Sequence, residues 1–239
     1  MQNNENNRRL PRSMDKNLRN KYLSKPRYHR YLIAVGNDHG RAIALYNANI
    51  LLSQAFHPLI TQFEVIFRNS VDTIMAQHFK DRNWIINQKT GFMNDRSLKK
   101  SNYYLRKCVN NVEAKLIKAK VPVSSEKIIS DQTLGFWIAF LASPHYRLVN
   151  GQTIHVFANK PSTENRTGIY TRLEMIKKFR NRVNHCEPVC FNGNHIDCSK
   201  ALLVRTSLYE LVEWIEPGLV PFFRNIDVID HQINQMLRI

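Results

Sequence analysis

Residues 179–188, Phe-Arg-Asn-Arg-Val-Asn-His-Cys-Glu-Pro, carry the pattern on which the expected fold and chemistry both depend. Apolar residues lead into this stretch and enter it close to a 3.6-residue period, at Ile169, Leu173, Ile176 and Val183. That period predicts an amphipathic α-helix. Pro188 is expected to end the helix, because proline has no N–H to donate and disfavours the helical conformation of the residue before it.

Three polar side chains lie near the predicted end of this helix: Arg180, Asn181 and His185. Residues four apart share a helix face, so Asn181 and His185 should point together, with Arg180 beside them. Arg180 also continues the apolar stripe, where a charge needs a partner or a cleft. An imidazole can deprotonate a hydroxyl while a guanidinium and an amide hold a phosphate. Because RNA carries its own nucleophile, the 2′-hydroxyl, these residues are candidate catalytic groups for RNA cleavage.

The overall charge agrees with a polyanionic partner. The 239 residues include 35 Lys and Arg against 19 Asp and Glu, a formal net charge of +16. Such an excess is an electrostatic footprint typical of nucleic-acid binding. The sequence shows no apolar run of about 18 residues, so we expect a cytoplasmic protein with no membrane partner. Residues 1–25 should be a basic, flexible tail, and residues 26–239 a single helical domain.

The rest of the chain predicts an all-α fold. Helical periodicity covers residues 41–56, 59–79, 98–121, 200–214 and 220–237, with Pro58 starting the second of these helices. One helix has a basic face that suits RNA, with Lys99, Lys100, Arg106 and Lys107. Asn150-Gly151 between apolar runs also allows a small β-hairpin near 146–158. The sequence predicts a helical bundle and leaves open whether it contains that hairpin.

Three blocks of this sequence resemble one known family. The order Arg-Asn-x-x-x-His is similar to the signature of HEPN-domain ribonucleases, and with Cys-Glu-Pro after the histidine it resembles a block of the Abi-like (AbiD/AbiF-type) bacterial abortive-infection proteins. Residues 63–72, Phe-Glu-Val-Ile-Phe-Arg-Asn-Ser-Val-Asp, resemble the Leu-Glu-x-x-Leu-Arg-Asn-x-Ile-Asp block of that family. Gly135-Phe136-Trp137 resembles its Gly-Phe-Trp block.

The resemblance implies a HEPN-type helical bundle with extra helices and a metal-independent endoribonuclease of phage defence. It would need no cofactor and would leave a 2′,3′-cyclic phosphate and a 5′-hydroxyl. The family arrangement implies a homodimer, in which two signature helices share one cleft and supply two imidazoles. The alternative is a non-catalytic, regulatory RNA-binding HEPN protein in complex with a small RNA. An antitoxin or small-RNA inhibitor is a further expected partner.

Four residues outside the catalytic group are expected to support it: Glu64, Arg68, Asn69 and Glu187. Arg182 is expected to bind RNA with the basic helix. One alternative remains for the cysteines, because Cys186, Cys190, His195 and Cys198 are residue types that bind zinc. Their spacing is looser than that of usual zinc sites, so reduced structural thiols are the main interpretation.

Overall fold

The computed structural model describes Arg19 and residues 21–239. Most of the predicted basic tail therefore lies outside the described residues. The predicted all-α fold is confirmed: the described residues form helices and one two-stranded hairpin. The elements are α2 (Lys25–Ala34), α3 (His39–Phe79), α4 (Trp84–Asn87), η1 (Phe92–Asn94), η2 (Arg96–Ser101), α5 (Tyr104–Lys118), α6 (Ser125–Asp131), α7 (Leu134–Ala139), α8 (Ser143–Leu148), η3 (Gln152–Phe157), α9 (Arg166–Asn184), β1 (Phe191–Asn192), β2 (His195–Ile196), α10 (Ser199–Ile215), η4 (Pro217–Leu219), α11 (Val220–Ile226) and α12 (Ile229–Met236).

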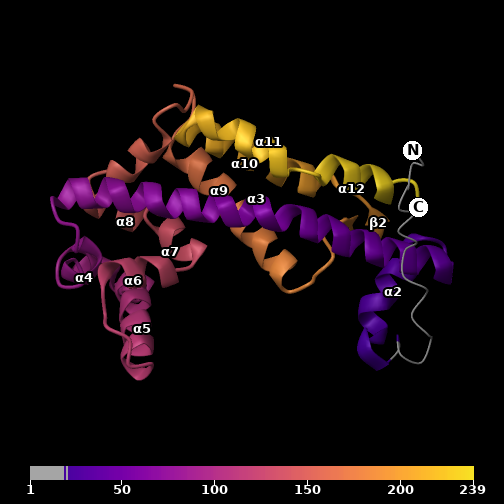
Figure 1. The fold of residues 1–239 in the computed structure, drawn as a ribbon, viewed down its shortest axis with the longest axis horizontal. Coiled ribbons are helices and arrows are strands. Elements are labelled where there is room, and N and C mark those ends of the chain that lie inside the picture. The colour runs from indigo at the N-terminus through magenta and orange to yellow at the C-terminus, as the bar shows by residue number, and fades with distance from the viewer. Residues whose placement is uncertain (1–18, 20) are drawn as a thin grey trace, which may run out of the picture.

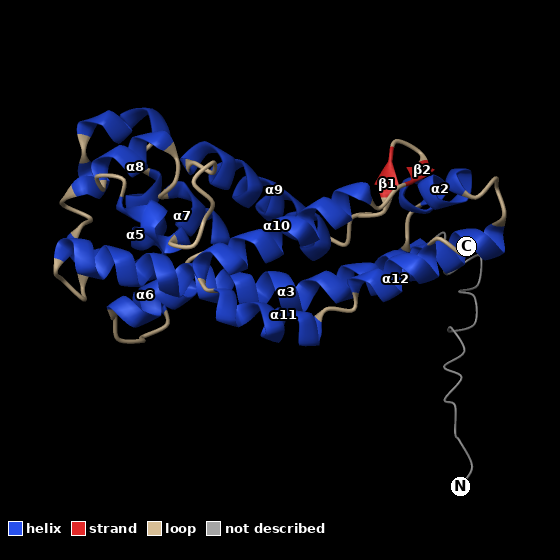
Figure 2. Ribbon diagram, turned by 90° about the horizontal axis from the view of Figure 1, so that it is seen from above, coloured by secondary structure: helices blue, strands red, loops and turns tan. Residues whose placement is uncertain are grey.

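The molecule is built around α3, a helix of 41 residues. In Figure 1, α3 runs the length of the molecule, with α9 to α12 along it, and α2 and the α4–α6 segment descend from its two ends. Figure 2 shows from above that α11 and α12 follow α3 closely. The result is an arch with two legs. The C-terminal part of α9 reaches the middle of its hollow underside (Figure 1).

The prediction of two helices on either side of Pro58 was wrong, because Pro58 lies inside α3. Proline removes the hydrogen bond that its own N–H would make to the carbonyl four residues earlier. Packing outweighs that loss. Phe56 and Leu59, on both sides of the proline, are fully buried in the same core, so the chain gains more by continuing the helix than by turning.

The hairpin is real but lies elsewhere. Residues 146–158, where it was predicted, are mostly helical, in α8 and η3. Asn150 and Gly151 do adopt left-handed conformations, with φ of 50° and 73°, but they join two helices because the residues around them bury into a helical core. The two observed strands pair Phe191 with Ile196 and Asn192 with His195, between α9 and α10.

A polar row on α3 holds the leg formed by α4–α6 and the helix that follows it. Glu64 accepts a hydrogen bond from the backbone N–H of Leu134 at 2.8 Å. Arg68 donates to the carbonyl of Ser130 at 3.3 Å, and Asp72 accepts from the indole N–H of Trp84 at 2.8 Å. The row therefore connects α3 to α7, α6 and α4 in turn.

By length and composition α3 is apolar enough to span a membrane, with a mean hydropathy of 1.2 in its best 18-residue window. The core helix of a soluble protein meets the same criterion. Here α2, α9, α10 and α12 all pack on α3, and 39% of that window is buried inside the protein.

Candidate functional site

The signature helix α9 ends in a tight turn before Pro188 is reached. Asn184 is its last helical residue, and Cys186 adopts a left-handed conformation with φ of 53°. The N–H of Glu187 bonds to the carbonyl of Arg182 at 2.8 Å, and the N–H of Cys186 bonds to that of Val183 at 3.1 Å. These two bonds form a Schellman motif, which satisfies the last carbonyls of a helix. The prediction that Pro188 ends the helix was therefore wrong, because the helix already ends in a turn centred on Cys186.

Aromatic packing joins α9 to α3 at this end. The rings of Phe179 and Phe56, both buried, lie 4.6 Å apart between centroids. Each is followed in the sequence by a polar residue, Arg180 after Phe179 and His57 after Phe56. The packed phenylalanines therefore hold Arg180 and His57 beside the same helix–helix seam.

Arg180 has the partner that its place on the apolar stripe requires. Its guanidinium lies 3.6 Å from the carboxylate of Glu64, with 31% of the Arg180 side chain and 20% of the Glu64 side chain exposed. The other oxygen of Glu64 accepts from the N–H of Leu134. One carboxylate of the 63–72 block thus contacts the signature at Arg180 and, at Leu134, the residue directly before Gly135-Phe136-Trp137.

Two adjoining pockets open along the seam, and we call them together the α3–α9 groove. The smaller has a volume of about 200 Å³ and is lined by His57, Ile60, Thr61, Glu64, Arg180, Val183 and Asn184. The larger has a volume of about 670 Å³ and is lined by Tyr46, Asn49, Ile50, Ser53, Gln54, His57, Val183, Asn184 and Cys186. His57, Val183 and Asn184 belong to both. The larger volume falls within the range of about 300–1,000 Å³ typical of ligand sites.

Asn181 and His185 are both exposed and do not line the groove beside Arg180. The reason is the helix period: a residue one position on is turned by about 100°, whereas a residue four positions on returns to the same face. Arg180 therefore shares its face with Asn184. His185 caps the helix between two residues that line the groove, Asn184 and Cys186, and so stands at its rim.

Of the predicted supporting and RNA-binding residues, Asn69 lies on α3, whereas Arg182 and Glu187 lie at the end of α9. Asn69 accepts from Arg68 at 3.3 Å, on the polar row of α3. Arg182 donates to the carbonyl of Pro188 at 2.5 Å and lies 3.7 Å from Glu187. Arg182 and Glu187 therefore hold the turn that follows α9. The guanidinium of Arg182 is already engaged within the protein.

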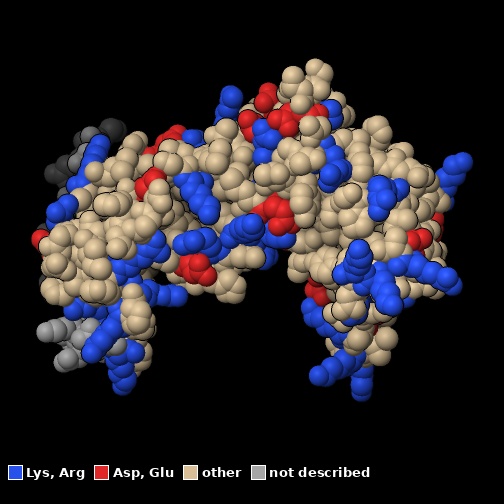
Figure 3. Space-filling view, turned by 180° about the vertical axis from the view of Figure 1, so that it is seen from behind, with Lys and Arg blue, Asp and Glu red and all other residues tan. Residues whose placement is uncertain are grey.

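The basic residues Lys99, Lys100, Arg106 and Lys107 lie on the leg rather than beside Arg180. The three lysines are exposed. Arg106 stacks on the ring of Tyr103 at 4.4 Å and donates to the side chain of Asn94. Figure 3 shows Lys and Arg gathered on both legs and across the hollow between them. This face surrounds the part of the arch that α9 reaches.

The cysteine cluster is not assembled as a metal site. Cys186 is exposed, whereas burial raises the pKa of the Cys190 thiol to about 12. Cys198 packs its sulfur 3.7 Å from that of Met236. Across Arg19 and residues 21–239, no group of three or more His, Cys, Asp or Glu side chains is placed to hold a metal ion. The positions of Cys186, Cys190, His195 and Cys198 therefore do not support the zinc alternative.

Sequence reasoning missed His57. No motif marks it, and it lies on a different helix from the signature, so only the packing of Phe56 on Phe179 brings it to Arg180. The fold and groove define an all-helical protein with a polar site at one helix end. No protein-family model, curated protein or solved structure matches the chain.

Proposed function

We propose that this protein is a metal-independent endoribonuclease of the bacterial phage-defence kind, which cleaves RNA at the α3–α9 groove. The observation that carries the proposal is the position of Arg180. Its guanidinium is held by Glu64 at a pocket that also contains a histidine and an amide, His57 and Asn184. The Abi-like resemblance supplies the reaction class, and the net charge of +16 suits an RNA substrate.

The reaction asks for three contributions. A base takes the proton of the 2′-hydroxyl, cations stabilise the charge that grows on the phosphate, and an acid protonates the departing 5′-oxygen. Arg180 fits the second role, because a guanidinium has five N–H donors and the long contact to Glu64 leaves most of them for phosphate oxygens. His185 at the rim fits one proton transfer, and Asn181, four residues before it on the same helix face, fits the role of orienting its ring. The products would be a 2′,3′-cyclic phosphate and a 5′-hydroxyl.

The proposal includes a homodimer, as the resemblance implies, and cytoplasmic action on RNA. Two chains with apposed α9 ends would enclose one RNA strand between their basic hollows. Such a two-fold contact pairs each patch with itself.

The test is cleavage of total bacterial RNA by the pure protein in EDTA. We expect Arg180→Ala and His185→Ala each to lower the rate by about 10²–10⁴, the range for charge stabilisation and general acid–base catalysis. Arg224→Ala, an exposed arginine on α11, is the control and should cleave normally. Cleavage that survives both Arg180→Ala and His185→Ala would contradict the site assignment. RNA binding without cleavage by the wild-type protein would favour the regulatory RNA-binding function, and activity that EDTA abolishes would favour a metal enzyme.

A further inference from the structure

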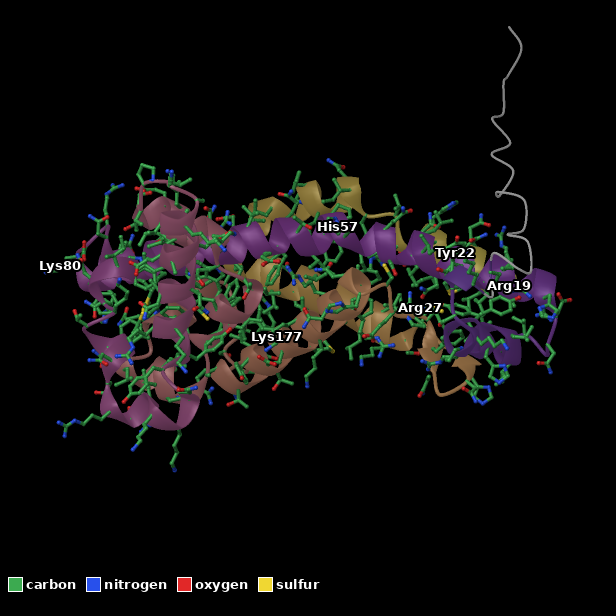
Figure 4. The ribbon with its side chains drawn as sticks, turned by 90° about the horizontal axis from the view of Figure 1, so that it is seen from below. Arg19, Tyr22, Arg27, His57, Lys80 and Lys177 are labelled. Atoms are coloured by element: carbon green, nitrogen blue, oxygen red, sulfur yellow. The ribbon has the colours of Figure 1, made fainter. Side chains whose placement is uncertain are left out.

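The proposed reaction has two proton transfers, but the signature contains one histidine. His57 is the second histidine at the groove. It lines both pockets, and in the smaller one it shares the lining with Arg180. Figure 4 labels it at the middle of α3, alongside α9.

The local structure holds His57 in place. Phe56, the residue before it, is fully buried against Phe179. Pro58 follows, and the hydroxyl of Thr61 donates to the carbonyl of His57 at 2.7 Å. The backbone at His57 is therefore fixed on both sides, while the residue itself is exposed. A fixed backbone with an accessible ring suits a group that must meet a substrate repeatedly in one geometry.

The size of the smaller pocket limits where a phosphate can lie. With a volume of about 200 Å³, the pocket has Arg180 and His57 among its lining residues. A phosphate that contacts the guanidinium of Arg180 inside this pocket is consequently brought close to the imidazole of His57. The larger pocket continues past His57 and offers Tyr46, Asn49 and Gln54 for an adjoining nucleotide.

We infer that His57 is the second proton-transfer residue, so that one chain holds both imidazoles of the reaction. This inference rests on the proposed endoribonuclease function. It also assigns the dimer a different role: a second copy would help to enclose the RNA, but its histidine would not be needed for chemistry. The titratable groups that line the groove with His57 are Tyr46 and Glu64 from its own helix, and Arg180 and Cys186 from α9 and the turn after it.

The first experiment does not depend on activity. Histidine ring signals of isotope-labelled protein are followed by NMR during titration with inorganic phosphate, with His57 assigned from the spectrum of His57→Gln. A phosphate bound beside the imidazole changes the surroundings of the ring, so we expect the His57 ring signals to shift and to saturate as phosphate is added. Arg180→Ala should abolish that change in the His57 signals. A His57 signal that phosphate leaves unchanged would overturn the inference.

The second experiment measures cleavage by His57→Ala and His57→Gln, with His78→Ala as the control. His78 lies on the same helix, about 30 Å away at 1.5 Å per residue. We expect the His57 variants to lose about 10²–10⁴ in rate and one limb of the pH–rate profile, while their melting temperature and RNA affinity stay normal. His78→Ala should keep both limbs. Full activity of His57→Ala would overturn the inference but leave the proposed function standing, whereas an inactive wild type would remove both.

The third experiment mixes His57→Ala with His185→Ala protein under conditions that allow subunit exchange. If each chain needs its own His57 and His185, every site in the mixture lacks one imidazole and the activity stays at the level of the separate variants. Recovery of activity in the mixture would mean that the two imidazoles come from different chains, which contradicts the one-chain site.

Discussion

Asn49, buried in the N-terminal half of α3, accepts a hydrogen bond from the backbone N–H of Val189 at 2.8 Å. Val189 follows the turn that ends α9, and it is itself buried. The side-chain amide of Asn49 on α3 therefore fixes the position of the chain just after the end of α9. His185 and the groove depend on that anchor.

Replacing Asn49 with alanine should destabilise the protein by about 1–3 kcal/mol, because the buried N–H of Val189 would lose its acceptor. Urea unfolding measures the change. Asn110→Ala, an exposed residue on α5, is the control and should stay within about 0.5 kcal/mol of the wild type. Equal effects of the two substitutions would mean that the Asn49 contact contributes little.

Cys186→Gly should stabilise the protein. Cys186 holds the left-handed position of the Schellman motif, with φ of 53°, where a side chain costs about 1–2 kcal/mol. Glycine avoids that cost but loses about 0.5–1 kcal/mol through the greater freedom of the unfolded chain. The expected net gain is up to about 1.5 kcal/mol by urea unfolding. Cys186→Ala keeps the strain and should show no gain. A less stable glycine variant would contradict the assigned strain.

Glu64 should show two separable functions. Glu64→Gln keeps an acceptor for the N–H of Leu134 and removes the charge beside Arg180, so it should cost less than Glu64→Ala, for which we expect about 1–3 kcal/mol. A double-mutant cycle with Arg180→Ala should give a coupling energy below about 1 kcal/mol, because the ion pair is partly exposed. A larger coupling energy would show that the pair is a main support of the fold.

Asp72 should make stability depend on pH in the sense opposite to an ordinary paired carboxylate. Burial raises the pKa of Asp72, although the hydrogen bond from Trp84 opposes this shift. Between the unfolded pKa, near 3.8, and the higher folded pKa, the folded state binds more protons, so this residue's contribution falls as the pH rises. Asp72→Asn keeps an acceptor for Trp84 and should gain stability relative to the wild type as the pH rises from 3 to 7. Unfolding measured at both pH values checks the sign, and an advantage confined to low pH would contradict it.

The lysines of the leg should contribute to RNA binding through phosphate contacts. Lys99→Gln, Lys100→Gln and Lys107→Gln together should flatten the salt dependence of RNA affinity by up to about two units of slope, at about 0.7 per contact to single-stranded RNA. Lys115→Gln is the matched control on the same leg, because Asp131 already pairs with Lys115 at 2.8 Å. Binding at several salt concentrations gives the slope. A slope unchanged by the triple substitution would exclude these lysines from the RNA-binding face.

Local patterns were sufficient to predict the helical class and much of the core. The period of Ile169, Leu173 and Ile176 placed those residues on the buried face of α9, and all three are fully buried. A helix period depends only on neighbours along the chain, which is why such patterns predict structure before any packing is known. The same reasoning indicated that Arg180 needs a partner or a cleft, and both are present.

Local signals failed where packing between distant segments opposed them. Pro58 was expected to start a helix, and Asn150-Gly151 allowed a hairpin. Pro58 instead lies inside α3, and Asn150-Gly151 joins α8 to η3. The sequence by itself determined the helical class, the basic character and the motif residues Arg180, Asn181 and His185. Only the tertiary structure decided that Arg180 lines a pocket with Glu64 and His57, whereas Asn181 and His185 do not line it. A helix period defines a shared face, but the contact between two helices depends on which aromatic side chains pack at their seam.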